Sequence, residues 1–532
     1  MELKTIKPAG SFYSDYLNWS KQVSGTHILT YSPKSVNELL NIVNWAWQNN
    51  FNVRVTGQQH NWSPLTIANG NNNSQVIFID MSKYLTSVTI NKTGESGTVT
   101  AQTGILMEDL FTALEKKKLG YYAHPAPGDL TLGGVLCING HGTCVPAKNE
   151  KLTDKGTWGT MSNNIVSLSA IVWDAATRRY TTKTFHRNDP EIAPFLTCVG
   201  RTIIYEVTMQ VPRNKRLRCQ SFINVPASEL FAANTAAGLR TFTHYLDQCG
   251  KVEAIWFPFT DKPWLKIWTE TPQYPTVSKP VHGPYNYPFS DRIPIELSDL
   301  IKLINNGCPE KTPDMGNLQM NLVKTGLGAT IAGDLWGWSK DLLLYVKPDT
   351  LRVTANGYAI ITRRDNIQSV LYDFVSKYEE MVDAYQKRNS WPMNGPIEVR
   401  VTGLDRPEES MVNGAIAPAL SAARPVDEHP EWDVAIWLDI LSMPDTPDAN
   451  KFYNEMEQWI FSHYSGDYAL TRVEWSKGWG YTDDATWENA QVINTIVPGT
   501  YKDWNNAIEI LDKYDPHHVF TSPFMRKLLV KR

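Results

Sequence analysis

The sequence has few of the features that mark membrane proteins and nucleic-acid-binding proteins. Its apolar runs, such as residues 435–438, are far shorter than the roughly 20 residues that a membrane-spanning helix needs. No run of basic residues occurs, and 51 Lys and Arg face 55 Asp and Glu, which gives a formal net charge of -4. A nucleic-acid partner would require a basic surface. We therefore expect a chain that neither crosses a membrane nor binds nucleic acid.

Several enzyme signatures are also missing. There is no G-x-G-x-x-G dinucleotide fingerprint, no G-x-x-x-x-G-K-[ST] phosphate loop, no H-E-x-x-H zinc motif and no G-x-S-x-G nucleophile elbow. The six cysteines form no C-x-x-C pair and no metal-binding spacing, and their even number permits disulfides without demanding them. The sequence therefore gives little support for a nicotinamide-dependent enzyme, a serine hydrolase or a metalloenzyme. We expect no metal site.

Aromatic residues, by contrast, are abundant. The 532 residues include 19 Trp, 23 Tyr and 17 Phe, and many of them lie in the middle of the chain, as at residues 256–268 and 336–338. One interpretation is a large core. The other is a broad apolar pocket, because aromatic walls suit a bulky, poorly soluble ligand.

The chain alternates helical and strand patterns, with a change of composition near residue 212. A length of 532 residues suggests two or three domains at about 150 residues each. A capping box of Ser35 and Glu38 predicts a helix before a strand that ends at Gly57. These patterns predict an α+β fold. Further strands are expected at 76–80, 88–102 (a hairpin), 165–173, 203–211, 396–402 and 434–442, and further helices at 105–119, 228–248, 365–387, 447–464 and 503–513.

Two glycine-containing tracts are the most informative motifs. Residues 57–64 follow a strand and offer backbone amides and two Gln side chains that can hold a pyrophosphate, although a plain surface loop is the alternative. In residues 125–143 five glycines, at 128, 133, 134, 140 and 142, allow the backbone to approach a flat ligand closely. Two such tracts, one of which carries a His, are more specific than either alone.

On these motifs, residues 53–64 and 125–143 resemble the FAD-binding domain of the vanillyl-alcohol oxidase flavoprotein superfamily. Residues 196–211 look like the closing strand of that domain, and residues 515–529 look like the C-terminal segment of its sugar-lactone and alditol oxidase branch. Over nearly its whole length the chain is similar to the covalent-flavin (type II) cholesterol oxidases. The resemblance implies an α+β, two-domain fold. Its parts would be an FAD-binding domain (1–212), a substrate-binding cap with an antiparallel sheet flanked by helices (213–500), and a C-terminal segment returning to the FAD domain (501–532).

The resemblance also implies FAD that is covalently linked through His60, the His of the first tract. The alternative for His60 is a loop side chain that hydrogen-bonds a phosphate. The pyrophosphate would lie against Gly57, Gln58, Gln59 and Asn61. The isoalloxazine and ribityl groups would lie against Pro127, Asp129, Thr131, Gly133, Gly134, Asn139, Gly140, Gly142, Thr143, Ser162 and Asn163.

Five residues of the cap are catalytic candidates. The strand at 396–402 places Glu398 and Arg400 on one face, where they can pair, although a solvated strand edge has the same pattern. The resemblance favours the functional interpretation, because type II enzymes carry a Glu-x-Arg pair that faces the flavin. Glu253 lies among apolar residues, where burial would raise its pKa toward an acid/base value, or else it is an exposed residue at the start of a strand. Glu474-Trp-Ser-Lys477 resembles the His-Trp-x-Lys motif of the lactone oxidases, with Glu in place of His.

The activity that the resemblance implies is oxidation of the 3β-hydroxyl of a sterol by O2, giving H2O2, with isomerisation of the 5-ene-3-ketone to the 4-ene-3-ketone. Lys477 would stabilise the reduced flavin, with an ordinary surface lysine as the alternative. Glu398 or Glu253 would move the proton from C4 to C6 during isomerisation. The alternatives are a sugar-lactone or alditol oxidase and a flavin-free sterol-binding protein. The expected partners are an apolar sterol and O2, with transient contact to lipid membranes or micelles. We expect a monomer secreted from a bacterium.

Overall fold

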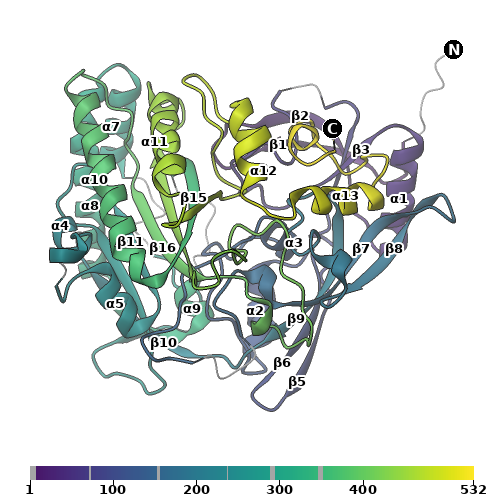
Figure 1. The fold of residues 1–532 in the computed structure, drawn as a ribbon, viewed down its shortest axis with the longest axis horizontal. Coiled ribbons are helices and arrows are strands. Elements are labelled where there is room, and N and C mark those ends of the chain that lie inside the picture. Colours follow the sequence, from purple (N-terminus) through teal and green to yellow (C-terminus); the bar gives the residue numbers. More distant parts are fainter. Residues whose placement is uncertain are drawn as a thin grey trace.

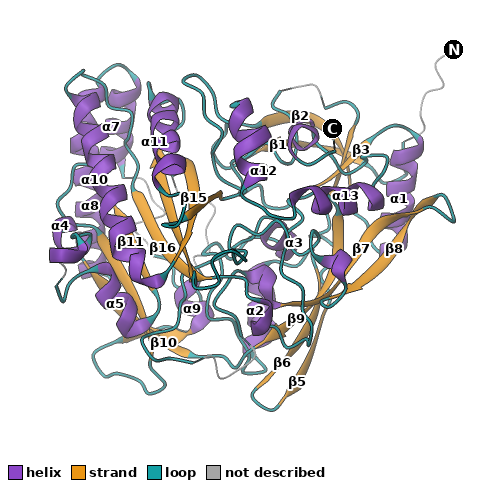
Figure 2. Ribbon diagram, in the orientation of Figure 1, coloured by secondary structure: helices purple, strands orange, loops and turns teal. Residues whose placement is uncertain are grey.

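The computed structural model describes residues 7–70, 73–151, 156–236, 238–287, 294–344 and 351–531. Three β-sheets organise these residues into two regions (Figure 1). The first region holds two smaller sheets, and the second holds one sheet of nine strands with helices packed on it (Figure 2). Within the described ranges, every helix is too short or too polar to span a membrane.

The first two sheets are built from the first 211 residues of the chain. Helix α1 (Val36–Gln48) begins at Ser35, whose side chain accepts a hydrogen bond from the backbone amide of Glu38, as the capping box predicts. The four-stranded sheet has the order β1-β2-β4-β3, and the five-stranded sheet has the order β5-β6-β9-β7-β8. Their strands are β1 (Phe12–Leu17), β2 (Ser24–Tyr31), β3 (Asn52–Val55), β4 (Val76–Ile79), β5 (Val88–Thr93), β6 (Ser96–Gln102), β7 (Ile165–Asp174), β8 (Arg179–His186) and β9 (Ile203–Val211).

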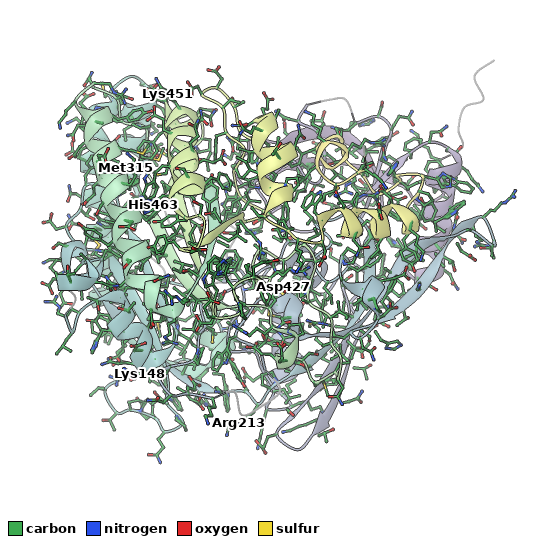
Figure 3. The ribbon with its side chains drawn as sticks, in the orientation of Figure 1. Lys148, Arg213, Met315, Asp427, Lys451 and His463 are labelled. Atoms are coloured by element: carbon green, nitrogen blue, oxygen red, sulfur yellow. The ribbon has the colours of Figure 1, made fainter. Side chains whose placement is uncertain are left out.

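The nine-stranded sheet has the order β13-β14-β10-β12-β11-β16-β17-β15-β18, and β13–β14 is its one parallel pair among the described strands. On one face Ile397, Val399 and Val401 join the apolar core that helices α10 and α11 complete. Figure 3 draws the side chains that fill this layer. The strands are β10 (Arg216–Phe222), β11 (Val252–Trp256), β12 (Trp264–Glu270), β13 (Lys279–Pro280), β14 (Asp334–Trp338), β15 (Thr354–Thr362), β16 (Ile397–Gly403), β17 (Val434–Ser442) and β18 (Leu470–Val473).

Most predicted elements are confirmed, but the single helix expected at 228–248 is wrong. The structure has two short helices there, because Thr241 starts a new helix by accepting a hydrogen bond from the amide of His244. The helix expected at 105–119 is shorter than predicted, and Lys118 after it has a left-handed φ of 61°. The remaining helices are α2 (Met107–Glu115), α3 (Leu132–Cys137), α4 (Ala227–Leu230), α5 (Phe242–Cys249), α7 (Ile295–Asn305), α8 (Thr312–Ala329), α9 (Ser339–Leu343), α10 (Ile367–Gln386), α11 (Ala449–His463), α12 (Val497–Gly499), α13 (Trp504–Tyr514) and α14 (Pro523–Leu528).

The C-terminal residues return to the first region, where Figure 1 shows α13 beside the N-terminal elements. The carboxylate of Asp515 accepts hydrogen bonds from the Tyr180 hydroxyl at 2.5 Å and from Arg201 Nη1 at 2.6 Å. The carbonyl of Val519 accepts a hydrogen bond from the amide of Val53 on β3. The hydrogen bond from Tyr180 of β8 and the backbone bond from Val53 of β3 therefore attach this segment to both N-terminal sheets.

Candidate active site

A large cavity lies where the two regions meet. Its volume is about 580 Å³, within the range of small-molecule sites, which is roughly 300 to 1,000 Å³. Both glycine-containing tracts line it, and so does the face of the nine-stranded sheet opposite α10 and α11. Aromatic side chains form part of its wall, namely Trp19, Trp62, Trp264, Trp268 and Tyr287.

The first tract supplies unpaired backbone donors to this cavity. Strand β3 ends at Val55, and residues 57–61 then form a loop that lines the cavity. The hydrogen bonds of the described residues include none that the backbone amides of residues 57–61 donate, and the same is true of residues 141–143 in the second tract. Consecutive free amides after a strand favour an anionic ligand such as a phosphate group.

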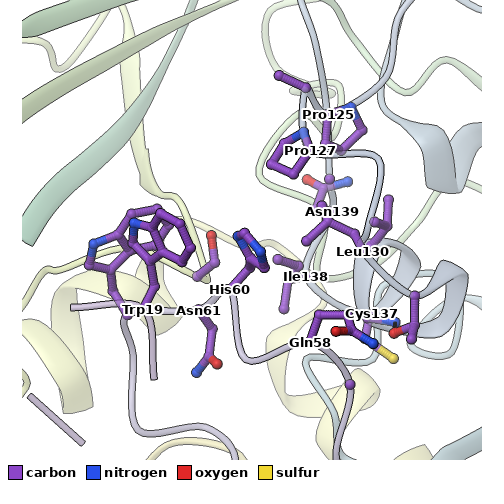
Figure 4. Close-up of a pocket in the computed structure, with 18 of the residues that line it drawn as sticks. Trp19, Gln58, His60, Asn61, Pro125, Pro127, Leu130, Cys137, Ile138 and Asn139 are labelled. Atoms are coloured by element: carbon purple, nitrogen blue, oxygen red, sulfur yellow. Dashed lines mark hydrogen bonds between the residues drawn. The ribbon is translucent and has the colours of Figure 1, made fainter. Parts of the chain in front are cut away.

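His60 projects from this loop toward the second tract. Figure 4 shows it between Trp19 and the residues around Ile138. Its ring stacks on Trp19 with centroids 4.3 Å apart, and its Nε2 lies 3.1 Å from Asp129 Oδ2. Burial raises the pKa of the Asp129 carboxyl, but the hydrogen bond and the charge interaction with His60, together with a backbone hydrogen bond, outweigh burial and the pKa is lowered. Asp129 is therefore an ionised partner that orients the imidazole.

The second tract approaches the cavity through its backbone. A Cβ on Gly142 would lie 2.7 Å from the carbonyl oxygen of His124, so this position accommodates only glycine without displacement of the backbone. Thr131 caps α3 by accepting a hydrogen bond from the amide of Gly134. The predicted cofactor-binding residues that line the cavity are Gly57, Gln58, Gln59, His60, Asn61, Pro127, Thr131, Gly133, Gly134, Asn139, Gly140, Gly142 and Thr143.

Ser162 and Asn163, by contrast, are not among the described residues that line this cavity. Both are fully buried behind the second tract. Ser162 Oγ donates to the carbonyl of Leu136, and the side-chain oxygen of Asn163 accepts a hydrogen bond from Arg187. Their hydrogen-bonding groups are used to hold neighbouring backbone and side chains, so they support the tract rather than contact a ligand.

The cap contributes a face of charged side chains, arranged in rows across the sheet. In one row Lys266, Glu253, Arg400 and Trp437 are register neighbours on β12, β11, β16 and β17. In the next row Glu398 of β16 is opposite Asp439 of β17. Because alternate residues of a strand project to the same face, both rows face away from α10 and α11. The predicted pairing of Glu398 with Arg400 is confirmed, since Arg400 Nη2 donates to Glu398 Oε2.

Glu253 is buried, as one interpretation held, but its predicted pKa shift is wrong in direction. Burial raises its pKa, yet Lys266 and Arg400 outweigh burial and lower the pKa to about 2. Glu253 Oε2 lies 2.5 Å from Lys266 Nζ, and Oε1 lies 2.9 Å from Arg400 Nε. Glu253 is therefore a fixed anion between two cations rather than a group that exchanges protons near neutral pH.

Glu474 and Lys477 lie at the other end of the charged face and line the cavity. Lys477 Nζ lies 3.2 Å from Asp439 Oδ2. Burial lowers the pKa of Lys477, but Asp439 and Glu474 raise it by more, so the amine is charged. Glu474 Oε1 lies 3.7 Å from Nε2 of His141, whose ring stacks on Trp437 at 3.6 Å. His141, Asp439 and Lys266 were not among the predicted site residues. Of these, His141 lay within the second tract, whereas no local signal marked Asp439 or Lys266.

Together, the free amides of two glycine-containing tracts, an imidazole on the first tract and a cavity closed by a separate antiparallel sheet define a flavoprotein of the vanillyl-alcohol oxidase type. A family model described as "FAD binding domain" matches residues 29–175, and one described as "Cholesterol oxidase, substrate-binding" matches residues 216–530. The chain belongs to the cholesterol oxidase family.

Solved structures agree with this family. The chain is 50% identical to a structure titled "Solvent-stable cholesterol oxidase", with a TM-score of 0.96 and 98% of each chain covered. It is 41% identical to a cholesterol oxidase from B. sterolicum, with a TM-score of 0.95 and 98% of each chain covered. It is also 24% identical to L-gulonolactone oxidase of Mus musculus over 46% of this chain and 49% of that protein. The chain spans about half the length of the curated relatives that it matches.

The residues present fit FAD. The free amides of residues 57–61 suit its pyrophosphate, and the buried oxygens Thr56 Oγ1 and Asp129 Oδ1 have no partner among the described residues. The imidazole of His60 lines the same cavity as the charged face of the cap. A dinucleotide held by both tracts would therefore present its flavin ring to the cap.

Proposed function

We propose that this chain oxidises the 3β-hydroxyl of cholesterol-like sterols with O2, giving H2O2, and isomerises the resulting 5-ene-3-ketone to the 4-ene-3-ketone. The observation that carries the proposal is one cavity lined by both glycine-containing tracts, by aromatic side chains and by the charged face of the cap. The tracts suit FAD, and the aromatic wall suits a rigid apolar ring system. Membership of the cholesterol oxidase family supports the sterol as substrate.

FAD would be held by the loop at residues 57–61 and by the second tract at residues 125–143. When bound, it would accept a hydride from the carbon that bears the hydroxyl and pass electrons to O2. The charged Lys477 supplies a positive charge at the end of the cavity where the reduced ring would carry negative charge.

The charged face of the cap would orient the substrate hydroxyl. Arg400 is fixed by three carboxylates, those of Glu253, Glu398 and Asp439, so its guanidinium is held in place and stays charged. Burial lowers the pKa of Arg400, but Glu398 and the other carboxylates raise it by more, so the net pKa is raised. A guanidinium without rotational freedom can hold an oxygen in one position while the proton leaves.

For isomerisation a carboxylate must take a proton from C4 of the 5-ene-3-ketone and return it to C6. The geometry favours Glu398 over Glu253. Glu253 contacts both Lys266 and Arg400, and its pKa of about 2 makes it a weak base. Glu398 lines the cavity and pairs with Arg400, so it is the freer of the two groups.

We infer that His60 bonds covalently to the flavin. Donation of its Nε2–H to Asp129 would leave the lone pair on Nδ1 as the nucleophile. Acid precipitation of the protein tests the linkage: yellow flavin should remain with the protein pellet, and intact mass should exceed the chain by one FAD. His60→Ala should move all flavin into the supernatant. Flavin that stays bound to the His60→Ala protein would show that another residue carries the link.

The activity itself is tested by oxygen uptake with cholesterol against sugars and polyols at equal concentration. We expect uptake with cholesterol and the appearance of the 4-ene-3-ketone absorbance. A preference for polyols would assign the chain to sugar-alcohol oxidation instead. A colourless preparation from flavin-replete cells would indicate a sterol-binding protein without flavin.

A further inference from the structure

Two buried carboxylates converge on one point above Gly357. This glycine of β15 is the register neighbour of Asp439 on β17, and its carbonyl accepts a hydrogen bond from the amide of Glu474 on the other side. Residues opposite one another in a sheet project to the same face, and the glycine between them has no side chain to keep the carboxylates apart. A Cβ on Gly357 would lie 2.9 Å from Asp439 Oδ1 and 2.9 Å from Glu474 Oε2.

Each carboxylate uses its other oxygen for a basic neighbour. Asp439 Oδ2 lies 3.1 Å from Arg400 Nη1 and 3.2 Å from Lys477 Nζ, and Glu474 Oε1 lies 3.7 Å from His141 Nε2. Asp439 Oδ1 and Glu474 Oε2 are buried and have no hydrogen-bond partner among the described residues. Each of these oxygens lies within 2.9 Å of the position that a Cβ on Gly357 would take, and two ionised carboxylates in one buried site repel one another unless a proton binds to the pair.

The charges of the cap face also favour a bound proton. Its carboxylates outnumber its cations by one, and His141 is a further titratable group that faces Glu474. The pKa of Asp439 is raised to about 6, because burial, Glu474 and Glu398 raise it more than Lys477 and Arg400 lower it. Glu474 is the more acidic member, since Lys477 and His141 outweigh burial and lower its pKa to about 2. The groups counted are Glu253, Glu398, Asp439 and Glu474 against Lys266, Arg400 and Lys477.

We propose that Asp439 and Glu474 bind a single shared proton over Gly357, and that this pair receives the proton released from the substrate hydroxyl. Glu474 lines the cavity and Asp439 lies behind it, so the proton enters through Glu474 and is held mainly by Asp439. The O–H bond of the substrate breaks, one O–H bond forms on the pair, and the pair later releases the proton to water. Asp439 is thus a positioning residue that acts through Glu474. The transfer of the substrate's proton to this pair rests on the proposed function, whereas the shared proton itself does not.

The shared proton is tested on the FAD-loaded enzyme without substrate. Infrared titration between about pH 5 and pH 8 should show a carboxylic acid band that disappears as the pH rises through about 6. Asp439→Asn and Glu474→Gln should each abolish this band while preserving side-chain shape. Gly357→Ala, whose methyl group would lie 2.9 Å from each oxygen and 2.7 Å from Lys477 Cγ, should shift its midpoint.

Glu457→Gln provides a matched control. Glu457 is a buried carboxyl of α11, its Oε2 accepts a hydrogen bond from the Tyr358 hydroxyl at 2.8 Å, and burial raises its pKa to about 7. This variant should remove a different band and leave the first unchanged. A first band that persists in Asp439→Asn would overturn the shared proton.

The role in catalysis is tested by the pH profile of kcat/KM for sterol oxidation. In the unmodified enzyme, kcat/KM should fall as the pH drops below about 6, because the pair of Asp439 and Glu474 is then already protonated. Asp439→Asn should lose this acidic limb. An unchanged profile in Asp439→Asn would refute the pair as proton acceptor even if its band titrates as expected. If no sterol is oxidised at all, the proposed function fails, and the infrared titration still decides the shared proton.

Discussion

Substitution of Glu253 by Gln keeps the shape of the side chain and removes its charge. Lys266, whose side chain is 2% exposed, would then lose its close carboxylate at 2.5 Å, and Arg400 would lose one of three. A pKa lowered from 4.5 to about 2 corresponds to roughly 3 kcal/mol, at about 1.4 kcal/mol for each pH unit. The loss of one partner from a buried ion pair costs about 3 to 5 kcal/mol, which agrees. We therefore expect Glu253→Gln to lower the free energy of unfolding by about 3 kcal/mol at neutral pH.

The pH dependence distinguishes this electrostatic effect from a packing defect. Because the folded-state pKa of Glu253 is lowered, its stabilisation is complete above about pH 4.5 and is lost as the pH falls toward 2. Urea unfolding followed by tryptophan fluorescence should give a difference of about 3 kcal/mol at pH 7 that shrinks at about pH 3.5. Glu380→Gln is the control, because Glu380 is 69% exposed and its pair with Lys377 should contribute less than about 1 kcal/mol. A Glu253→Gln difference that is the same at both pH values, or below 1 kcal/mol at pH 7, would refute the argument.

Three further outcomes follow from the contacts described. Asp129→Asn removes the anion that orients His60, so the covalently bound fraction of flavin after acid precipitation should fall, while Asp109→Asn on the nearby helix α2 should leave it unchanged. Lys477→Met should lower kcat for sterol oxidation about 100-fold, and Lys477→Arg should recover part of it, whereas equal losses in both variants would argue against a role for the positive charge. Asp515→Asn breaks the fully buried pair with Arg201, so the free energy of unfolding should drop by about 3 kcal/mol. Limited proteolysis should then cut the C-terminal segment faster than in the unmodified chain. Equal resistance to proteolysis would show that apolar contacts hold the segment.

The parts of the site that the sequence predicts are those made by neighbouring residues. The loop at 57–61 follows a strand directly, and the backbone of residues 125–143 is shaped by its own glycines, so both are visible as local patterns. The pair of Glu398 and Arg400 is visible for the same reason, because residues two apart on a strand share a face.

The side-chain contacts that the sequence does not reveal depend on the order in which the strands pair. Lys266, Glu253 and Arg400 are brought together by antiparallel pairing across β12, β11 and β16, and only this pairing decides whether burial or charge controls the pKa of Glu253. Asp439 lies in a strand of otherwise mainly apolar residues, and no neighbouring residue indicates that it belongs to a functional site. The proximity of Ser162 to the second tract is apparent from the sequence, but the partner of its hydroxyl, the carbonyl of Leu136, is not.

Phe520 lines the cavity, and its carbonyl accepts a hydrogen bond from Arg54 of β3. Arg54 also donates to the carbonyls of Leu65 and Gly200, so one guanidinium joins three distant stretches of chain around the dinucleotide site. During synthesis the N-terminal sheets leave the ribosome hundreds of residues before position 520 is made. This part of the cavity wall is thus completed only after position 520 has been made, long after both glycine-containing tracts.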